Sequence, residues 1–291
     1  MTQVITRFAP SPTGRLHLGH AYSALLVHNY ARSRGGAVLL RIEDIDPGRS
    51  RPEHVGGIVE DLDWLGISWD GEIVLQSQRL ALYAEALERL KAMDLVYPCF
   101  CTRSAIAAEI AASASAPHGP DGPHYPGTCR RLEAKTRERR REVEAHAWRL
   151  DVAKAAAVAG PLWWSDHGRR IAAEPETFGD VVLARKDAPT SYHLAVTVDD
   201  AAQGITDVIR GEDLFHATHV HRLLQALLGL PVPNYHHHKL LTDAEGRRLA
   251  KRTGAPSLRD MREAGGDPRT LASELLTGLV PGGISYLRSL D

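Results

Sequence analysis

Cysteine is scarce in this sequence, and long apolar runs are missing. The 291 residues include only three cysteines, an odd number that is too small for a disulfide framework. No apolar run approaches the length that crosses a bilayer. Residues 1–7 hold no apolar stretch behind a basic cluster, so a secretory signal is not expected. We therefore expect a soluble, cytoplasmic protein with no membrane partner.

A strong excess of charge is also missing, because the formal net charge is −1. The whole molecule thus has no general attraction for nucleic acid, although a local basic surface can still exist. The cations gather after the last cysteine, at Arg130, Arg131, Lys135, Arg137, Arg139, Arg140 and Arg141. Glu133 and Glu138 interrupt them, which is also typical of a solvated helix face. A phosphate-contacting surface and an ordinary exposed helix both remain open.

The N-terminal residues follow the pattern of an α/β protein. Residues 3–8 fit a short buried strand, and a helix is expected to begin near Leu18 after a loop rich in Pro and Gly. Residues 37–42 form a second strand pattern, which completes a βαβ opening. Apolar stripes at helical spacing predict two more helices, at 55–65 and 80–90.

The composition changes past residue 96, and regular strand and helix patterns return near residue 180. Between these points lie the cysteines and a stretch rich in Ala, Ser, Pro and Gly at 111–126, typical of a loop-rich insertion. After it, residues 180–185, 192–198 and 205–210 are strand-like, and a helix is expected around 219–228.

A histidine-rich string stands where the first strand passes into the first helix. Residues 7–20 read RFAPSPTGRLHLGH. A helix start can hold phosphate, Gly19 lets a ligand approach the backbone, and His17 and His20 can donate hydrogen bonds to phosphoryl oxygens. Over its whole length the string resembles the "HIGH" region of glutamate-specific class I aminoacyl-tRNA synthetases. The resemblance implies that His17, Gly19 and His20 bind ATP and that both histidines are catalytic.

A basic loop late in the chain resembles the second signature of that family, the "KMSKS" loop. Residues 246–252 read GRRLAKR, in which Lys251 matches the second lysine and Arg248 replaces the first. The resemblance implies that Arg248 and Lys251 bind ATP and that Lys251 is catalytic, by neutralising the departing pyrophosphate. Ala250 stands in place of a serine, so the hydrogen bond of that hydroxyl is missing here.

A site selective for glutamate needs fixed cations for two carboxylates and a carboxylate for the ammonium group. Glu43 follows the second expected strand and Arg210 ends a later one, at the strand ends where α/β sheets bind ligands. Taken singly, such residues also fit structural ion pairs, for example Arg41 with Glu43. The resemblance covers these segments and implies five glutamate-binding residues: Arg7, Ser11, Glu43, Tyr192 and Arg210.

All three cysteines fall in the expected insertion. Cys99, Cys101 and Cys129 would supply three thiolates, and a structural zinc site takes four ligands. Three buried free thiols are the alternative. His118, His124 and Tyr125 all lie nearby as a fourth ligand. The arrangement resembles short members of the same family with tyrosine at this position, which implies Tyr125, with His124 as its rival. The run at 236–238, three histidines placed before a strand-like segment, is expected to be structural.

The resemblance runs from about residue 4 to residue 252 and implies tRNA, L-glutamate and ATP with Mg²⁺ as partners. The chain continues for 40 residues after Lys251, which is short for the helical anticodon-binding region of glutamyl-tRNA synthetases. This resembles the members that activate glutamate without tRNA and attach it to queuosine at the wobble position of tRNA(Asp). A minimal glutamyl-tRNA(Glu) synthetase and a catalytically silent zinc module that binds RNA are the alternatives.

Together these observations predict an α/β protein with a Rossmann-like, doubly wound parallel sheet, an inserted zinc-binding subdomain and a short helical C-terminal tail. The expected divisions are 1–95 for the first half of the core and 96–179 for the zinc-binding, tRNA-contacting insertion. The second half of the core with the lysine loop occupies 180–252, and the tail 253–291. We expect a monomer with one structural Zn²⁺.

Overall fold

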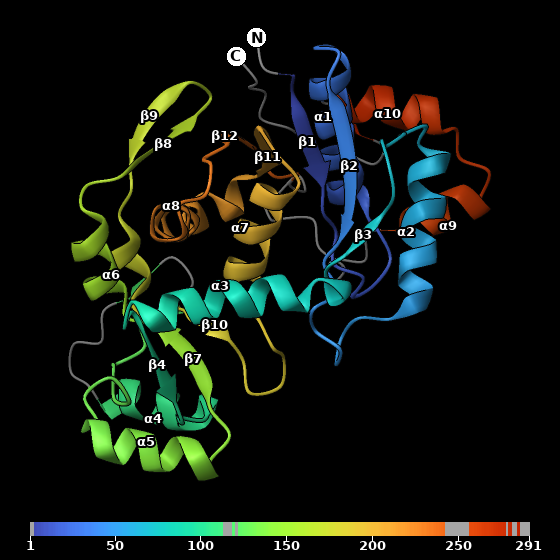
Figure 1. The fold of residues 1–291 in the computed structure, drawn as a ribbon. Helices are drawn as coiled ribbons and strands as arrows, with labels where there is room; N and C mark the ends of the chain where they lie inside the picture. The colour runs from blue at the N-terminus through green and yellow to red at the C-terminus, as the bar shows by residue number, and fades with distance from the viewer. Residues whose placement is uncertain are drawn as a thin grey trace.

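A computed structural model describes residues 3–112, 118–119, 122–241, 256–277, 279–280 and 284–285. Among these residues, no helix has both the length and the apolar character needed to cross a membrane. The chain forms a mostly parallel sheet covered by helices, from which a smaller lobe projects (Figure 1).

The first half of the parallel sheet is the βαβ unit that the sequence predicts. Strands β1 (Ile5–Phe8), β2 (Ala37–Ile42) and β3 (Val74–Leu75) pair in this order, all parallel. Helix α1 (Leu18–Arg32) joins β1 to β2, and α2 (Pro52–Trp64) follows β2. Buried aliphatic side chains from these elements form one continuous core, which confirms the expected opening.

The second half extends the sheet in the opposite direction. Its strand order is β11-β12-β8-β9, where only β9 is antiparallel to its neighbour. The strands are β11 (Asp207–Gly211), β12 (Asn234–His238), β8 (Trp163–Asp166) and β9 (Arg169–Ala172). The Thr206 amide donates to the Ile5 carbonyl at 2.9 Å, which places β11 beside β1.

Helix α8 (Ala217–Leu228) connects β11 to β12 on this second side. The chain therefore winds away from the β1–β11 junction in both directions, as in a doubly wound sheet, and the fold prediction is confirmed. Ligands of such folds bind at the carboxyl ends of the strands where the winding direction reverses. A ligand-binding site is thus expected at the β1–β11 junction.

The projecting lobe is built on an antiparallel sheet of order β10-β7-β4. Its elements are β4 (Val96–Cys99), α4 (Arg103–Ala112), β5 (His118–Gly119), β6 (Gly122–Pro123), α5 (Ala134–Val143), β7 (Ala147–Leu150) and β10 (Val182–Ala184). Both sheets contain strands from either side of the expected division at residue 180. In the lobe, β10 pairs with β7 from before the division, and in the parallel sheet, β12 pairs with β8 from before it.

Further helices complete the described part of the chain. They are α3 (Leu80–Ala92), α6 (Val152–Ala159) and α7 (Tyr192–Ala202), with the short 3-10 helices η1 (Gln76–Gln78), η2 (Pro175–Phe178) and η3 (Glu212–Leu214). Figure 1 shows α3 crossing below the parallel sheet toward the lobe.

The prediction of a strand at 192–198 is wrong, because this segment is the first part of α7. Leu194, Ala195, Val196 and Thr197 are all buried, so the helix is covered on several faces. A helix of this kind shows no amphipathic period, and its β-branched residues mimic a strand. Tyr192 consequently begins a helix and does not lie in a sheet.

One smaller expectation also needs correction. The three histidines at 236–238 lie within strand β12 and not before it. The expected helical tail is present as α9 (Leu258–Glu263) and α10 (Pro268–Thr277), and an antiparallel pair follows it, β13 (Leu279–Val280) with β14 (Ile284–Ser285). Leu258, Leu271 and Leu275 are buried in the same core as α1, so the tail belongs to the core.

Candidate active site

A cleft of roughly 630 Å³ opens at the carboxyl ends of β1 and β11, where the winding of the sheet reverses. The structure brings together in its lining every described residue that the sequence predicted for ATP and glutamate. These are Arg7, Ser11, His17, Gly19, His20, Glu43, Tyr192 and Arg210. They come from β1, the loop after it, α1, the end of β2, α7 and β11.

The start of α1 is organised by the two histidines of the first signature. His17 is the N-cap: its Nδ1 accepts from the Gly19 amide at 3.1 Å, and His20 Nδ1 accepts from the His17 amide at 3.2 Å. This reciprocal arrangement has the geometry of a capping box, with imidazoles in place of the usual side chains. Since both Nδ1 atoms accept, the neutral rings carry their protons at Nε2.

Gly19 is required at this position by its neighbour. A Cβ atom added there would lie 3.0 Å from Cε1 of His17, closer than side chains ordinarily pack. The glycine therefore lets the His17 ring fold over the first turn of α1, beside the amides at the helix start. Free amides at a helix N-terminus favour an anion such as phosphate.

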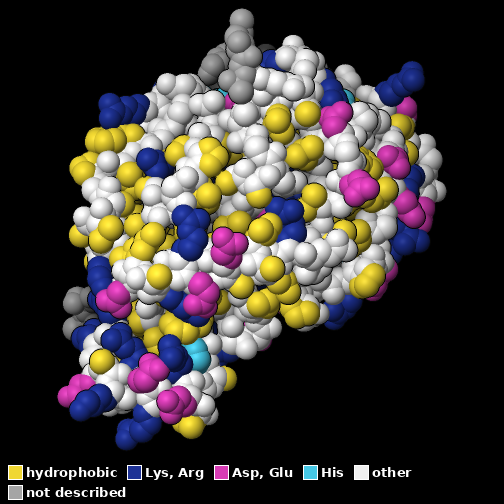
Figure 2. All heavy atoms as spheres, viewed as in Figure 1, with side chains coloured by type: hydrophobic (Ala, Val, Ile, Leu, Met, Phe, Trp, Pro, Cys, Tyr) yellow, Lys and Arg dark blue, Asp and Glu magenta, His cyan; other side chains and the backbone are white. Residues whose placement is uncertain are grey.

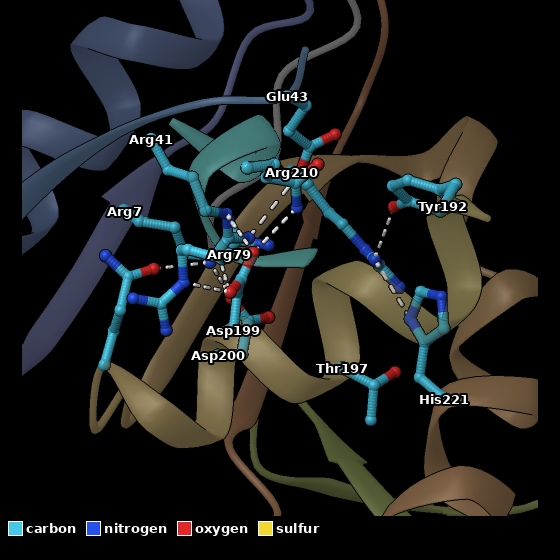
Figure 3. A network of polar contacts seen from close by, with 12 residues as sticks. Arg7, Arg41, Glu43, Arg79, Tyr192, Thr197, Asp199, Asp200, Arg210 and His221 are labelled. Atoms are coloured by element: carbon cyan, nitrogen blue, oxygen red, sulfur yellow. Dashed lines mark hydrogen bonds and ion pairs between the residues drawn. The ribbon is translucent and has the colours of Figure 1, made fainter. Parts of the chain in front are cut away.

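A buried ion-pair network supports the floor of the cleft (Figure 3). Asp200, from α7, pairs with Arg7 at 2.9 Å and with Arg41 at 2.8 Å. Asp199 pairs with Arg79 at 2.7 Å. The described arginines of this network are thus each matched by a carboxylate.

Glu43 is a carboxylate in the lining of the cleft. Its Oε1 lies 3.6 Å from Nη2 of Arg41, so the structural ion pair considered from the sequence is present. Burial is the main cause that raises the pKa of Glu43, while the charges of Arg41 and Arg7 oppose the rise. A ligand cation beside Glu43 would favour its ionised form.

Arg210 differs from the arginines of the network. It is buried, yet among the described residues it makes no ion pair with a carboxylate. Its Nη1 donates to the Tyr192 hydroxyl at 3.2 Å, and its Nη2 donates to Thr218 Oγ1 at 2.7 Å and to the Leu214 carbonyl at 3.1 Å. The guanidinium is hydrogen-bonded, but its charge is not neutralised by these partners. An uncompensated buried cation is a strong attractor for an anionic ligand.

Sequence reasoning missed the residues that hold these arginines in place. Asp199 and Asp200 lie 120 and 193 residues from the arginines that they bind, Arg79 and Arg7. Thr218, His221 and His237 follow Arg210 by 8, 11 and 27 residues, and no motif marks them. A pair of acidic residues inside an otherwise apolar segment, as at Asp199 and Asp200, was the one available signal, because buried carboxylates require cationic partners.

The lysine loop lies outside the described residues, so Arg248, Ala250 and Lys251 are not placed. Both flanks of the gap from 242 to 255 are placed. Leu241 lines the cleft, and Ser257 forms a β-bridge with His17, supported by a hydrogen bond from the Leu258 amide to the Leu16 carbonyl at 3.0 Å. The chain therefore leaves the described structure at the lining of the cleft and re-enters it beside His17.

The three cysteines form a second cluster in the projecting lobe. Their sulfur atoms all lie within 4.8 Å of one another, and Cys101 and Cys129 are 3.5 Å apart. Zinc–thiolate bonds of about 2.3 Å in a tetrahedron separate the sulfurs by roughly 3.8 Å, so the spacing fits one metal ion. The Cys129 sulfur also accepts from the Phe100 amide at 3.3 Å, which is typical of a thiolate ligand.

The two rivals for a fourth zinc ligand, Tyr125 and His124, differ in their contacts. The Tyr125 hydroxyl lies 3.4 Å from the Cys101 sulfur and accepts from the Cys129 amide at 2.9 Å. The His124 ring instead contacts the Thr177 carbonyl at 2.6 Å, and His124 is not part of the cysteine group. Of these two residues, Tyr125 is therefore the one whose side chain faces the thiols. The side chain of His118 is not among those that the structure describes.

The cleft and the fold define a class I nucleotide-dependent synthetase. A family model described as "tRNA synthetases class I (E and Q), catalytic domain" matches residues 3–285. The chain belongs to this family of enzymes, whose substrates are ATP, an amino acid and tRNA.

Two curated relatives of the chain carry the same, more specific name. The chain is 52% identical over 271 residues to the glutamyl-Q tRNA(Asp) synthetase of Rhodobacter capsulatus, covering 91% of this chain and 97% of the relative. It is 45% identical over 293 residues to the protein of the same name from Symbiobacterium thermophilum, covering 94% and 86%. Both alignments span nearly the whole length of the relatives.

A solved structure gives the same fold. Glutamate-tRNA synthetase from Elizabethkingia anophelis matches with a TM-score of 0.73 and 30% identity, over 87% of this chain and 53% of that one. The chain thus spans about half the length of that synthetase.

Proposed function

We propose that this protein activates L-glutamate with ATP and transfers the glutamyl group to queuosine at the wobble position of tRNA(Asp). The observation that carries the proposal is that one cleft is lined both by Arg210, a buried cation that no described carboxylate neutralises, and by the carboxylate of Glu43, which pairs with Arg41. The names of the relatives, which match nearly end to end, support the acceptor.

In this proposal the cleft recognises glutamate by complementary charge. Arg210 and the Tyr192 hydroxyl bind one carboxylate, and Glu43 accepts from the ammonium group. Arg7 and Ser11 line the same cleft and contribute further donors. A carboxylate arriving at Arg210 would replace the longer of its present contacts, such as the one to Tyr192 at 3.2 Å. The specificity then follows from charge, since glutamine lacks one of the two carboxylates.

The first chemical step joins glutamate to AMP. An oxygen of the α-carboxylate attacks the α-phosphorus of ATP, the bond to the β-phosphate breaks, and pyrophosphate leaves. His17 and His20 donate hydrogen bonds to phosphoryl oxygens as negative charge develops, next to the start of α1. Arg248 and Lys251 neutralise the departing pyrophosphate, and Mg²⁺ accompanies ATP. The protein supplies positioning and charge, without a covalent intermediate on a side chain.

The second step transfers the activated acyl group. A hydroxyl of the cyclopentenediol ring of queuosine attacks the glutamyl carbonyl, the bond to AMP breaks, and an ester forms as the hydroxyl proton is released. We further propose that the lobe with α4 and α5 contacts the tRNA. Figure 2 shows Lys and Arg side chains on this lobe, interspersed with Asp and Glu. Arg140 and Arg141 pair with Glu144 and Glu138, so part of this charge is already matched.

Cys99, Cys101, Cys129 and Tyr125 would hold one zinc ion as a structural ligand set. The metal would tie the end of β4 to the loop before α5, in a lobe where the local core consists mainly of these ligands and Tyr97 and Phe100.

Replacing Tyr125 by phenylalanine is expected to lower zinc affinity roughly 10- to 100-fold, because one of four ligands is lost while the ring remains. Replacing His124 by alanine should leave the affinity unchanged. Zinc content after dialysis against a graded chelator measures both. Loss of zinc from the His124 variant, with retention in the Tyr125 variant, would reverse the assignment of the ligand.

The acceptor is tested by incubating the protein with labelled glutamate, ATP and three tRNAs. These are tRNA(Asp) carrying queuosine, tRNA(Asp) without it, and tRNA(Glu). We expect label only on the first, because the other two lack the cyclopentenediol nucleophile.

Label on tRNA(Glu) instead would make the protein a minimal glutamyl-tRNA synthetase, a function that its likeness to the Elizabethkingia enzyme also supports. Zinc and RNA binding without any glutamate-dependent exchange of pyrophosphate into ATP would leave only the silent RNA-binding module.

A further inference from the structure

The guanidinium of Arg210 is surrounded by acceptors, and two of them are histidines. In addition to the contacts described above, Nε donates to Nε2 of His237 at 3.2 Å, and Nη1 lies 3.4 Å from Nδ1 of His221. Figure 3 shows His221 and Tyr192 beside the guanidinium. Each of the five N–H groups of Arg210 thus has a neutral partner.

The protonation of His237 is fixed by the partner behind it. Its Nδ1 donates to Asp166 at 2.9 Å, and its backbone amide donates to the same oxygen at 3.2 Å. The neutral ring therefore offers Nε2 as an acceptor to Arg210. The imidazole of His237 lies between Asp166 and the guanidinium of Arg210. Asp166 therefore orients this ring without forming an ion pair with Arg210.

His221 forms a second chain of the same kind. Its Nδ1 accepts from Arg210, which leaves the proton on Nε2, 3.2 Å from Nδ1 of His193. Burial, followed by the charge of Arg210, holds the pKa of His221 well below its usual value, and burial lowers that of His237 to about 4. Both rings are accordingly uncharged near neutral pH.

Arg7 in the same cleft shows the alternative way of holding a buried arginine. It is fixed by the carboxylate of Asp200 at 2.9 Å, which neutralises it. A carboxylate in place of either histidine would hold Arg210 more firmly, because charge-assisted hydrogen bonds are the stronger ones. It would also cancel the charge that an anionic ligand needs. Imidazoles hold the guanidinium of Arg210 in place and leave its positive charge available to an anionic ligand.

We propose that His221 and His237 are positioning residues that fix Arg210 through uncharged ring nitrogens, so that its positive charge is kept for a carboxylate of the amino acid substrate. The inference rests on the proposed function and specifies how the glutamate site is prepared.

The test compares a neutral with an acidic replacement of the same size. His221→Gln retains an acceptor for Arg210, whereas His221→Glu adds a carboxylate. The KM values for glutamate and for ATP are measured by glutamate-dependent exchange of pyrophosphate into ATP, together with the melting temperature of each variant. We expect His221→Gln to stay within about 3-fold of the wild type and His221→Glu to raise the glutamate KM at least about 30-fold, with the ATP KM nearly unchanged.

The same comparison is repeated at Thr218, with Asn and Asp, which covers the case that His221→Glu does not fold. His219 on the same helix is the matched control, because its ring accepts from the Glu174 amide and does not touch Arg210. His219→Glu should leave the glutamate KM unchanged.

Three outcomes would overturn the inference while the proposed function stands. One is a wild-type glutamate KM in the acidic variants, as expected if the histidines merely anchored Arg210. Another is an equal loss in the Gln and Glu variants, and a third is the failure of both acidic variants to fold. A wild-type protein without glutamate-dependent exchange would instead overturn the proposed function, and this inference with it.

Discussion

Replacing Arg210 by leucine is expected to lower kcat/KM for L-glutamate about 1000-fold in pyrophosphate exchange. Truncating one partner of a buried charge pair costs up to about 4 kcal/mol, which corresponds to roughly this factor. Arg210 is the cation in the described part of the cleft that no carboxylate neutralises, so no neighbour can take its place. The loss should fall on the glutamate KM and on kcat, and much less on the ATP KM.

The controls separate binding from folding. Arg210→Lys keeps the charge but loses the planar fork, and it should retain more activity than the leucine variant. Arg89→Leu removes an arginine that donates to the Leu228 carbonyl at 2.7 Å, away from the cleft. This control should lose some stability with an unchanged glutamate KM. A folded Arg210→Leu protein with wild-type kinetics for glutamate would show that Arg210 does not bind the substrate.

The N-terminal half of the core could be predicted from the sequence because its signals are local. The strand at Ile5–Phe8, the helix starting at Leu18 and the strand at Ala37–Ile42 each carry their own apolar pattern and breakers. The described signature residues meet in one cleft for the same reason. They lie next to strand ends, and parallel strands end at the same edge of a sheet.

The supporting shell of the site could not be predicted, because it is assembled from distant segments. Asp200 reaches Arg7 across 193 residues of sequence, and Asp166 reaches His237 across 71. Such pairs have no local spacing to detect. The first part of α7, the helix that carries Asp199 and Asp200, has the sequence pattern of a strand, because burial on several faces hides its helical period.

Strand order was equally invisible in the sequence. β10 has an ordinary strand pattern, but nothing in it tells whether its partner is β7 of the lobe or a strand of the parallel sheet. Pairing is decided by the complete set of neighbouring faces, which forms only in the folded chain.

Replacing Lys251 by alanine is expected to reduce kcat for adenylate formation roughly 100- to 1000-fold, which is typical of losing a group that stabilises transition-state charge. The flanks of its segment support this expectation, because Leu241 lines the cleft and Ser257 pairs with His17. The proposed mechanism assigns Lys251 to the departing pyrophosphate, and the described flanks of its segment lie at the same cleft. The glutamate KM should change little, since Lys251 contacts neither carboxylate in the proposed mechanism.

Two comparisons make that result specific to Lys251. Zinc content should stay as in the wild type, which shows that the lobe is intact. Arg259→Ala removes an exposed cation on α9 that pairs with Glu263 at 2.6 Å, and it should leave exchange unchanged. Arg248→Ala should reduce exchange less than Lys251→Ala and more than Arg259→Ala, because the proposed mechanism gives Arg248 a share in neutralising the pyrophosphate. Unchanged pyrophosphate exchange in the Lys251 variant would mean that the α1 start alone manages the phosphate charge, and His17 and His20 would then have to supply the whole of that stabilisation.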